Sequence, residues 1–321
     1  MRIGWVGFHQ EGVPALRGVL DAGFRVVAVI TLDTHSAEQR SGAVDYGPIC
    51  RESGVPLHRV GNVNSDSAVE LLAGLDLDLL IVVGWSQILG SRALRTARLG
   101  AIGSHASWLP KDRGRAPVNW AIIRGETQTG NTLMWLAEGV DSGEIIDQTV
   151  IPITDFDSCA SIYDAVASSN RNMILGLLAS LARGVRPGVG QLVTDEPLLP
   201  GRSPEDGAID WSGSARSVYD LVRAVTRPYP GAFGYLDGRR VTVWKSALLP
   251  FEGAVGAPGA VLGPVVSFID SACGQLVACG TGAVLLMEVE SDEGHLLAGR
   301  ALAELPWQEK LWDAGKQGAE A

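Results

Sequence analysis

The sequence predicts an α/β protein in which a doubly wound, largely parallel sheet is followed by a smaller β-rich domain. Three observations support this. The chain has 321 residues, of which 46% are apolar, enough for one large domain and one small one. Its first half alternates short apolar runs with amphipathic helical segments. Its second half contains short alternating runs separated by turn residues, which is typical of antiparallel strands.

In the first half, the apolar runs are short and rich in β-branched residues, as strands buried on both faces require. The expected strands are residues 3–8, 26–31, 79–84 and 101–104, and the expected helices are residues 13–22, 44–53 and 67–75. Gly23 and Gly54 follow two of these helices, at the position where a helix end favours positive φ. Ligands of such folds bind beyond the carboxyl ends of the strands, so we expect the site in segments 8–12, 84–89 and from residue 104 onward.

The second half begins after a long helix expected at 158–183. Residues 184–204 are rich in Gly, Pro and turn residues and are interpreted as a linker. A helix over 212–226 then precedes strands within 231–246 and 274–289, and Asp237-Gly238 is a hairpin turn signal. The predicted boundaries are 1–195 for the first domain, 204–307 for the second and 308–321 for a polar, frayed tail.

Composition excludes several classes of function. The net charge is −10, which disfavours a nucleic-acid partner, because neutralising phosphates needs a basic face. Four cysteines without a C-x-x-C pair indicate reduced thiols, and the five histidines show no metal-ligand spacing, so we expect no metal. The first strand is followed by Gly7-Phe8-His9-Gln10-Glu11-Gly12 instead of G-x-G-x-x-G, which removes the main support for a nicotinamide site. No signal peptide or membrane-spanning run is present, and we expect a cytoplasmic protein.

The most informative stretch is IGSHASWLPKDRGRAPVNWAIIRGETQTGNTLMWLAEGVDSGEIIDQ, residues 102–148. It places a histidine at a predicted strand end, followed by Leu109-Pro110, then Arg113-Gly114, and Asp141 between small residues. In this order and spacing it resembles the folate-dependent formyltransferases, whose pattern is N-x-H-x-S-x-LP-x-x-RG followed by G-x-D-x-G-x-I. Within that family the sequence is most similar to the enzymes that formylate the amine of a nucleotide-linked sugar, such as UDP-4-amino-4-deoxy-L-arabinose formyltransferase.

The resemblance extends over most of the chain. It includes Gly7-Phe8-His9, the turn at residues 62–64, the segment 201–204, the segment 223–233 and Val241-x-Val243-Trp244. It implies a Rossmann-like catalytic domain followed by a small β-barrel that resembles an OB fold. It also implies 10-formyltetrahydrofolate as co-substrate and a small-molecule amine, an amino sugar, as acceptor. A homo-oligomer is possible, and the sequence does not determine the oligomeric state.

The chemistry of formyl transfer fits two residues of the motif. An amine attacks a carbonyl, so a base must take its proton and donors must stabilise the oxyanion. His105 suits the proton transfer, because a histidine titrates near neutral pH, and Asp141 would orient its ring. On residue types alone, His105 could instead cap a loop and Asp141 could be a turn acid between glycines.

The resemblance also maps the ligand-binding residues. The folate would lie along Gln87, Ile88, Leu89, Arg115, Ala137, Glu138, Gly139, Val140 and Asp141. His9 and Ser107 would contact the acceptor. Ordinary connecting loops and a surface arginine are the structural alternatives for these segments.

One position departs from the family pattern. Gly103 stands where the family has asparagine, the expected donor to the formyl oxygen. The glycine could open space for a formimino or larger acyl group.

From the resemblance and the motif residues together, we predict an N-formyltransferase acting on an amino sugar, and we keep two alternatives. One is a related transferase of another one-carbon or acyl group, or a donor hydrolase. The other is a binding protein without turnover. Methionyl-tRNA formyltransferase is disfavoured by the short, nearly uncharged segment 33–46.

Overall fold

The computed structural model describes residues 1–192 and 194–313, and their contacts divide the chain into two compact units. The first unit contains residues 1–118, 127–154 and 161–201. The second contains residues 119–126, 155–160 and the chain from 202 onward. Each unit is described by itself.

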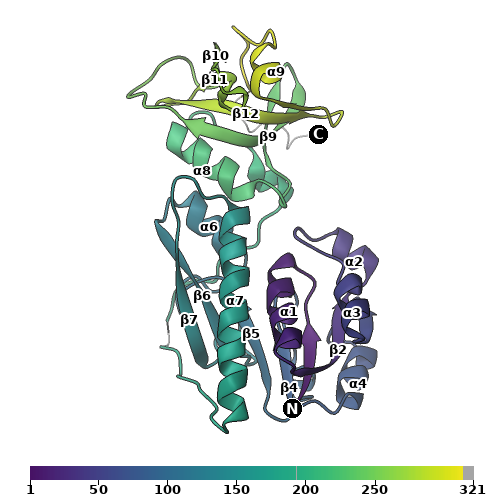
Figure 1. Ribbon diagram of the computed structural model, residues 1–321. Coiled ribbons are helices and arrows are strands. Elements are labelled where there is room, and N and C mark those ends of the chain that lie inside the picture. Colours follow the sequence, from purple (N-terminus) through teal and green to yellow (C-terminus); the bar gives the residue numbers. More distant parts are fainter. Residues whose placement is uncertain (193, 314–321) are drawn as a thin grey trace. The chain divides into compact units, whose positions relative to one another are not determined.

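The first unit is built on a seven-stranded sheet with the order β3-β2-β1-β4-β5-β6-β7 (Figure 1). The strands are β1 (Arg2–Val6), β2 (Arg25–Leu32), β3 (Leu57–Val60), β4 (Leu79–Val82), β5 (Ala101–His105), β6 (Gln128–Trp135) and β7 (Ile145–Pro152). The ladders from β3 to β5 are parallel, which confirms the predicted fold class, whereas β6 and β7 are antiparallel additions. The sheet is therefore mixed, and the sequence did not reveal β3, β6 or β7.

Helices cover both faces of this sheet, because successive strand residues point to opposite faces. The helices of this part of the chain are α1 (Val13–Asp21), α2 (Thr34–Glu38), α3 (Gly47–Ser53), α4 (Asp66–Gly74), α5 (Ser91–Leu94), α6 (Pro117–Ile123) and α7 (Cys159–Ala182). Trp5 and Ile81 belong to a core that includes residues of α1, α3 and α7, and Val6 and Leu80 to a core that includes residues of α4 and α5. The predicted helix 44–53 begins only at Gly47.

β1 and β4 are neighbours at the point where the winding of the sheet changes direction. β2 and β3 extend the sheet on one side of this pair and β5 extends it on the other. The loops that leave β1, β4 and β5 therefore gather at one edge, and this edge is where doubly wound sheets bind ligands.

β6 escaped prediction because polar residues interrupt its apolar pattern. Asn131 and Thr132 are fully buried in it. The Asn131 amide donates to Ser169 Oγ at 2.7 Å and to Asn170 Oδ1 at 2.6 Å, both in α7. These polar side chains hydrogen-bond to neighbouring elements, so the strand lacks a continuous apolar face.

The second unit contains a six-stranded antiparallel sheet, which includes strands in the predicted segments 231–246 and 274–289 and two further strands that the sequence did not reveal. Its strands are β8 (Ala232–Leu236), β9 (Arg239–Leu248), β10 (Val261–Val265), β11 (Gly274–Ala278), β12 (Ala283–Ser291) and β13 (Leu296–Ala298), followed by α9 (Gly299–Ala303). Asp237 and Gly238 both have positive φ between β8 and β9, the conformation that the Asp-Gly hairpin signal predicts.

The segment that follows residue 307 packs onto this sheet. Val261 N donates to Lys310 O at 2.9 Å, and Asp313 N donates to Tyr235 O at 2.9 Å, so the segment bridges β10 and β8. Trp312 is 1% exposed and stacks at 5.3 Å from Trp211. Residues 314–321 of the predicted tail lie outside the described residues.

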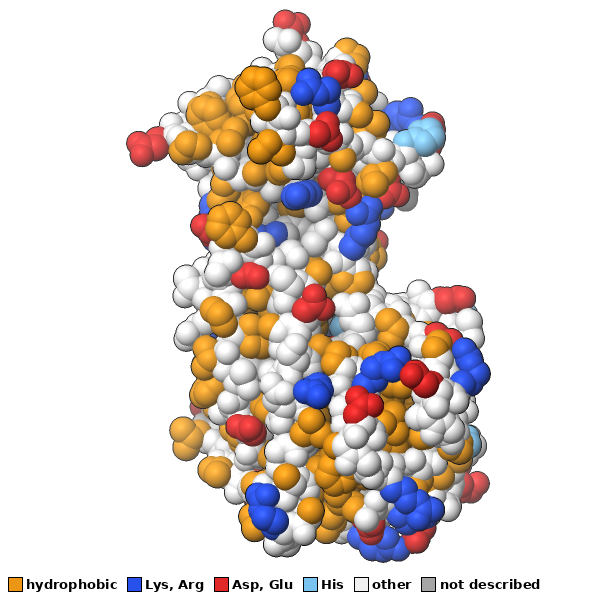
Figure 2. All heavy atoms as spheres, in the orientation of Figure 1, with side chains coloured by type: hydrophobic (Ala, Val, Ile, Leu, Met, Phe, Trp, Pro, Cys, Tyr) orange, Lys and Arg blue, Asp and Glu red, His pale blue; other side chains and the backbone are white. Residues whose placement is uncertain are grey.

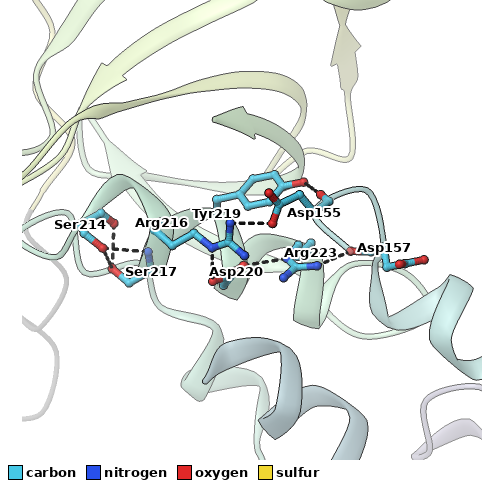
Figure 3. Close-up of polar contacts among 8 residues, drawn as sticks. All are labelled: Asp155, Asp157, Ser214, Arg216, Ser217, Tyr219, Asp220 and Arg223. Atoms are coloured by element: carbon cyan, nitrogen blue, oxygen red, sulfur yellow. Dashed lines mark hydrogen bonds and ion pairs between the residues drawn. The ribbon is translucent and has the colours of Figure 1, made fainter. Parts of the chain in front are cut away.

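Helix α8 (Ala215–Val225) carries a charge network in the second unit, in which Asp220 and Arg223 are buried and Arg216 is exposed (Figure 3). Asp220 accepts from Arg216 Nε at 2.8 Å and from Arg223 Nε at 2.7 Å. Arg216 also pairs with Asp155 at 2.6 Å, and Arg223 donates to Asp157 O at 2.8 Å. Each charge in this network therefore has an opposite charge or a carbonyl beside it.

Other general features follow the sequence. Acidic and basic side chains are interspersed over the face of the first unit drawn in Figure 2. The four cysteines are buried free thiols. Within residues 1–192 and 194–313, no helix combines the length and apolar character needed to cross a bilayer.

Candidate active site

His105 and Asp141 meet at the carboxyl end of β5. His105 Nδ1 lies 3.5 Å from Asp141 Oδ2, and the two side chains are 9% and 18% exposed. On the other side of the ring, His105 Nε2 lies 2.8 Å from the carbonyl oxygen of Asp112. A carbonyl only accepts, so Nε2 is the donor in this contact. Because both ring nitrogens face oxygen acceptors, a ring that has taken up a proton can donate from both sides.

The loop from Ser107 to Gly114 holds the Asp112 carbonyl in place. Ser107 Oγ donates to Lys111 O at 2.8 Å, and Thr132 Oγ1 donates to Ser107 O at 2.7 Å. Ser107 is 1% exposed. Its hydroxyl is thus engaged in shaping the loop, and its predicted contact with the acceptor stays a prediction.

The loop that carries Asp141 is also tightly held. Asp141 has φ of 49°, a left-handed conformation that Asp tolerates, and Gly114 N donates to its Oδ2 at 2.9 Å. A Cβ on Gly143 would lie 1.6 Å from the Trp135 carbonyl oxygen, so only glycine allows the loop to return to β6. The G-x-D-x-G spacing therefore has a local structural reason.

Gln191 is a residue that sequence reasoning missed. Its Nε2 donates to Asp141 O at 2.9 Å and to Gly143 O at 2.7 Å. It lies in the segment interpreted as a linker, yet that segment runs along the first unit: Val189 bridges Ile145 and Leu199 bridges Gly114. The Gly, Pro and turn residues of the segment gave no sign of this packing, because its contacts are made mainly by backbone groups.

The predicted folate residues after β4 divide into two kinds. Gln87 donates to Gly61 O at 2.7 Å and accepts from Val63 N at 2.9 Å, and Leu89 is buried in the core. Ile88, in contrast, is 61% exposed, with its carbonyl accepting from Asn64 Nδ2 at 2.8 Å. Of these three side chains, Ile88 is the one open to a ligand, and Gln87 and Leu89 brace the loop.

The two predicted folate segments are brought together. Ser91 Oγ, just after the first segment, donates to the carboxylate of Glu138 in the second. Ala137, Gly139 and Val140 complete the loop that begins at the end of β6. Arg115 is exposed and donates its backbone N–H to Leu199 O at 3.0 Å. The structure thus brings the expected folate-binding loops to the same edge as His105.

His9 lies at the carboxyl end of β1 and is 7% exposed. Its Nδ1 accepts from Glu11 N at 3.4 Å, and its ring packs edge-on against Tyr163 at 5.2 Å. Burial lowers the pKa of His9 to about 4, so the ring is neutral near pH 7. The ring is therefore neutral and largely enclosed by protein, and its predicted contact with the acceptor stays a prediction.

Gly103 does not leave an empty space. A Cβ built on it would lie 2.8 Å from Leu136 Cδ2 and 3.2 Å from Val82 O. The Leu136 side chain therefore covers the place where a larger residue would project. A larger residue at position 103 would require the end of the Leu136 side chain to move, and the expectation that this glycine admits a bulkier acyl group stays a prediction.

No metal centre forms from the groups that the structure describes. Among residues 1–192 and 194–313, no three His, Cys, Asp or Glu side chains come together in an arrangement that could hold a metal ion.

Comparison with known families gives two matches. Residues 21–178 match the formyl transferase model, and residues 202–305 match the model of the formyl transferase C-terminal domain. The two matches follow one another along the chain and together cover most of it. The sequence-based resemblance is thereby confirmed.

Solved structures with similar folds include three of interest. HypX from Aquifex aeolicus, in complex with tetrahydrofolic acid, is 20% identical with a TM-score of 0.64, and the match covers 93% of this chain and 46% of that one. An N-formyltransferase from Helicobacter canadensis, with folinic acid and dTDP-3-aminofucose, is 15% identical with a TM-score of 0.63, covering 88% and 98%. A sugar N-formyltransferase from Shewanella sp. is 20% identical with a TM-score of 0.60, covering 78% and 98%.

These likenesses establish the fold. The chain spans less than half the length of HypX and nearly the whole of the two sugar enzymes. At 15–20% identity they do not by themselves assign an acceptor.

Proposed function

The chain belongs to the formyltransferase family, and we propose that it transfers a formyl group from 10-formyltetrahydrofolate to the amine of an amino sugar. The amino sugar is nucleotide-linked or part of a natural product. The observation that carries this proposal is the contact of His105 with Asp141 at the strand edge where the expected folate loops meet.

The reaction forms a bond between the acceptor nitrogen and the formyl carbon and breaks the bond between that carbon and N10 of the folate. A proton from the acceptor must leave, and N10 must gain one. His105 is the group that carries this proton, and Asp141 fixes the ring orientation while Gly114 N fixes Asp141. For Nε2 to accept from the amine, it must release the Asp112 carbonyl that it now contacts at 2.8 Å.

The folate assignment is supported by the neighbours' ligands and by this chain's own loops. Tetrahydrofolic acid is bound by HypX, and folinic acid by the Helicobacter canadensis enzyme. In this chain, Ile88 and the loop 137–141 offer an exposed apolar side chain and accessible backbone groups. A flat pterin needs such a surface.

The amino-sugar assignment is supported by two comparisons. The Helicobacter canadensis structure contains dTDP-3-aminofucose, and the Shewanella protein is named a sugar N-formyltransferase. Both are matched over nearly their full length. Transfer of a different one-carbon or acyl group stays the alternative, and the Leu136 side chain beside Gly103 is the group that would have to move to admit it.

The test is a transfer assay with the full chain. 10-Formyltetrahydrofolate is mixed with a panel of nucleotide-linked amino sugars, dTDP-3-aminofucose among them. We expect tetrahydrofolate release that depends on the acceptor, together with an acceptor whose mass has grown by one CO group. Folate release without an acceptor would indicate a hydrolase instead, and folate binding without release would indicate a binding protein.

A further inference from the structure

A second acidic side chain, that of Glu11, lies against Gly84 at the carboxyl edge of the sheet, where β5 also ends at His105. Phe8 N and His9 N both donate to Gly84 O, at 3.1 and 3.3 Å, so the loop after β1 sits directly on Gly84. In the β4–β5 ladder Val82 pairs with Gly103. β4 ends at Val82 and β5 ends at His105, so Gly84 lies in the loop just beyond β4, next to the strand whose end carries His105.

Glu11 covers Gly84. A Cβ built on Gly84 would lie 3.2 Å from Glu11 Cγ and 3.3 Å from Glu11 Oε1, and Gly84 has φ of +63°. The same Cβ would lie 2.7 Å from His9 Cβ, so the lack of a side chain at residue 84 lets both His9 and Glu11 pack against this loop. Glu11 therefore lies against the loop that leaves β4, and His105 ends β5, the neighbouring strand.

Among the described residues, the groups that the structure shows in contact with Glu11 carry no positive charge near pH 7. Its side chain is 13% exposed, and its Oε2 lies 3.8 Å from His9 Nδ1. That nitrogen already accepts from Glu11 N, and burial keeps His9 neutral. Tyr46, whose hydroxyl donates to His9 O at 3.0 Å, contributes a neutral phenol, and Tyr163 packs on His9 from α7. Burial accordingly raises the pKa of Glu11 to about 7.

Formylation of an amine needs two proton acceptors. Near neutral pH an alkylammonium must lose one proton before its nitrogen can attack, and the attacking nitrogen loses a second when the amide forms. One of the two protons ends on N10 of tetrahydrofolate, and the other ends in solvent. The His105–Asp141 pair provides for one transfer, which leaves the other without an assigned group.

We propose that Glu11 takes the first proton from the acceptor ammonium, and that His105 then takes the second and delivers it to N10. This assignment rests on the proposed function. As a carboxylate, Glu11 also attracts the ammonium group toward the edge where His105 lies. After transfer, Glu11 returns its proton to solvent through the small part of its side chain that remains exposed.

The experiment compares Glu11→Gln with the wild type in the transfer assay with 10-formyltetrahydrofolate, from pH 6 to pH 9. Gln keeps the shape and removes the proton acceptor. Wild-type kcat/KM should rise through pH 7 and level off. The variant should be about 10²-fold slower near pH 6.5 and should approach the wild type as the acceptor amine loses its proton in solution. Glu52→Gln, an exposed change on α3, is the matched control for charge and should leave the profile unchanged.

The outcomes separate the two claims. A variant that equals the wild type, or is slower by the same factor at every pH, would overturn the role of Glu11 and leave the formyltransferase proposal standing. Absence of transfer by the wild type to every amino sugar in the panel would overturn the proposed function, and the role of Glu11 with it.

Discussion

Buried carboxylates occur in both units, but their surroundings differ. On α8, Asp220 is 3% exposed and is held between two arginines (Figure 3). In the first unit, Glu11 is enclosed beside a neutral histidine. Burying a charge is costly unless an opposite charge accompanies it, so a paired carboxylate fixes structure and an unpaired one holds a proton. The contrast separates a group that holds a helix in place from a group available for chemistry.

The largest expected effect is on turnover at the candidate active site in the first unit. His105→Ala and Asp141→Ala should each lower kcat by roughly 10²–10⁴-fold, because proton transfer acts in the transition state. Folate affinity should stay within a few-fold in both variants. His58→Ala, on β3, is the control for loss of a histidine. A kcat near that of the wild type in either variant would remove that residue from the mechanism.

Breaking the charge network on α8 should lower the free energy of unfolding instead of turnover. Arg223→Leu leaves Asp220 with one of its two arginines, and removing one partner of a buried pair typically costs about 3–5 kcal/mol. Urea unfolding measures the change, and the double variant Arg223→Leu/Asp220→Leu should recover part of it. If the single variant unfolds at the same urea concentration as the wild type, the network contributes little.

For the unpaired carboxyl group of Glu11, we expect substitution to raise the stability of the protein instead of lowering it. The pKa of Glu11 rises from 4.5 to about 7 on folding, so the folded state keeps a proton that the unfolded state has already lost. Stability from this group is therefore present below pH 4.5 and is lost as the pH rises to 7. Glu11→Gln should match the wild type near pH 4.5 and exceed it above pH 7, by about 3 kcal/mol at most. If the difference in unfolding free energy between Glu11→Gln and the wild type were the same at every pH, Glu11 would titrate with the same pKa in the folded and unfolded states.

A smaller effect is expected at Gly103. Gly103→Asn alone should reduce transfer, because its side chain must displace Leu136. Gly103→Asn/Leu136→Ala should make room for the amide and raise transfer above the Leu136→Ala control, by about tenfold, less than one oxyanion donor is usually worth. Equal rates for the double variant and its control would show that position 103 does not face the formyl group.

The parts of the fold that the sequence predicted are those with a simple periodic cause. β1, β2, β4 and β5 are buried on both faces and read as continuous apolar runs. β6 could not be found in this way, because Asn131 and Thr132 are buried for their hydrogen bonds. The joining of β8 and β10 by residues 310–313 depends on backbone pairing, which leaves no side-chain signal.

The same division holds for the site. His105 and Asp141 were predicted because a motif of fixed spacing carries them. Glu11 and Gln191 were not, because their roles come from neighbours distant in the chain, Gly84 for one and the Asp141 loop for the other. The roles of Gln87, Leu89 and Ser107 depend on whether a side chain points to a ligand or to the protein, which spacing does not determine.

The direct test of the contrast between the two carboxylates is the titration of Glu11 itself. Carbon-13 NMR of protein labelled at the glutamate carboxyl carbons would follow each group with pH, and the Glu11 signal is the one lost in Glu11→Gln. We expect a midpoint near pH 7. A midpoint near the ordinary value of 4.5 would show that the group is solvated or paired, and would contradict its assignment as the proton acceptor of the site.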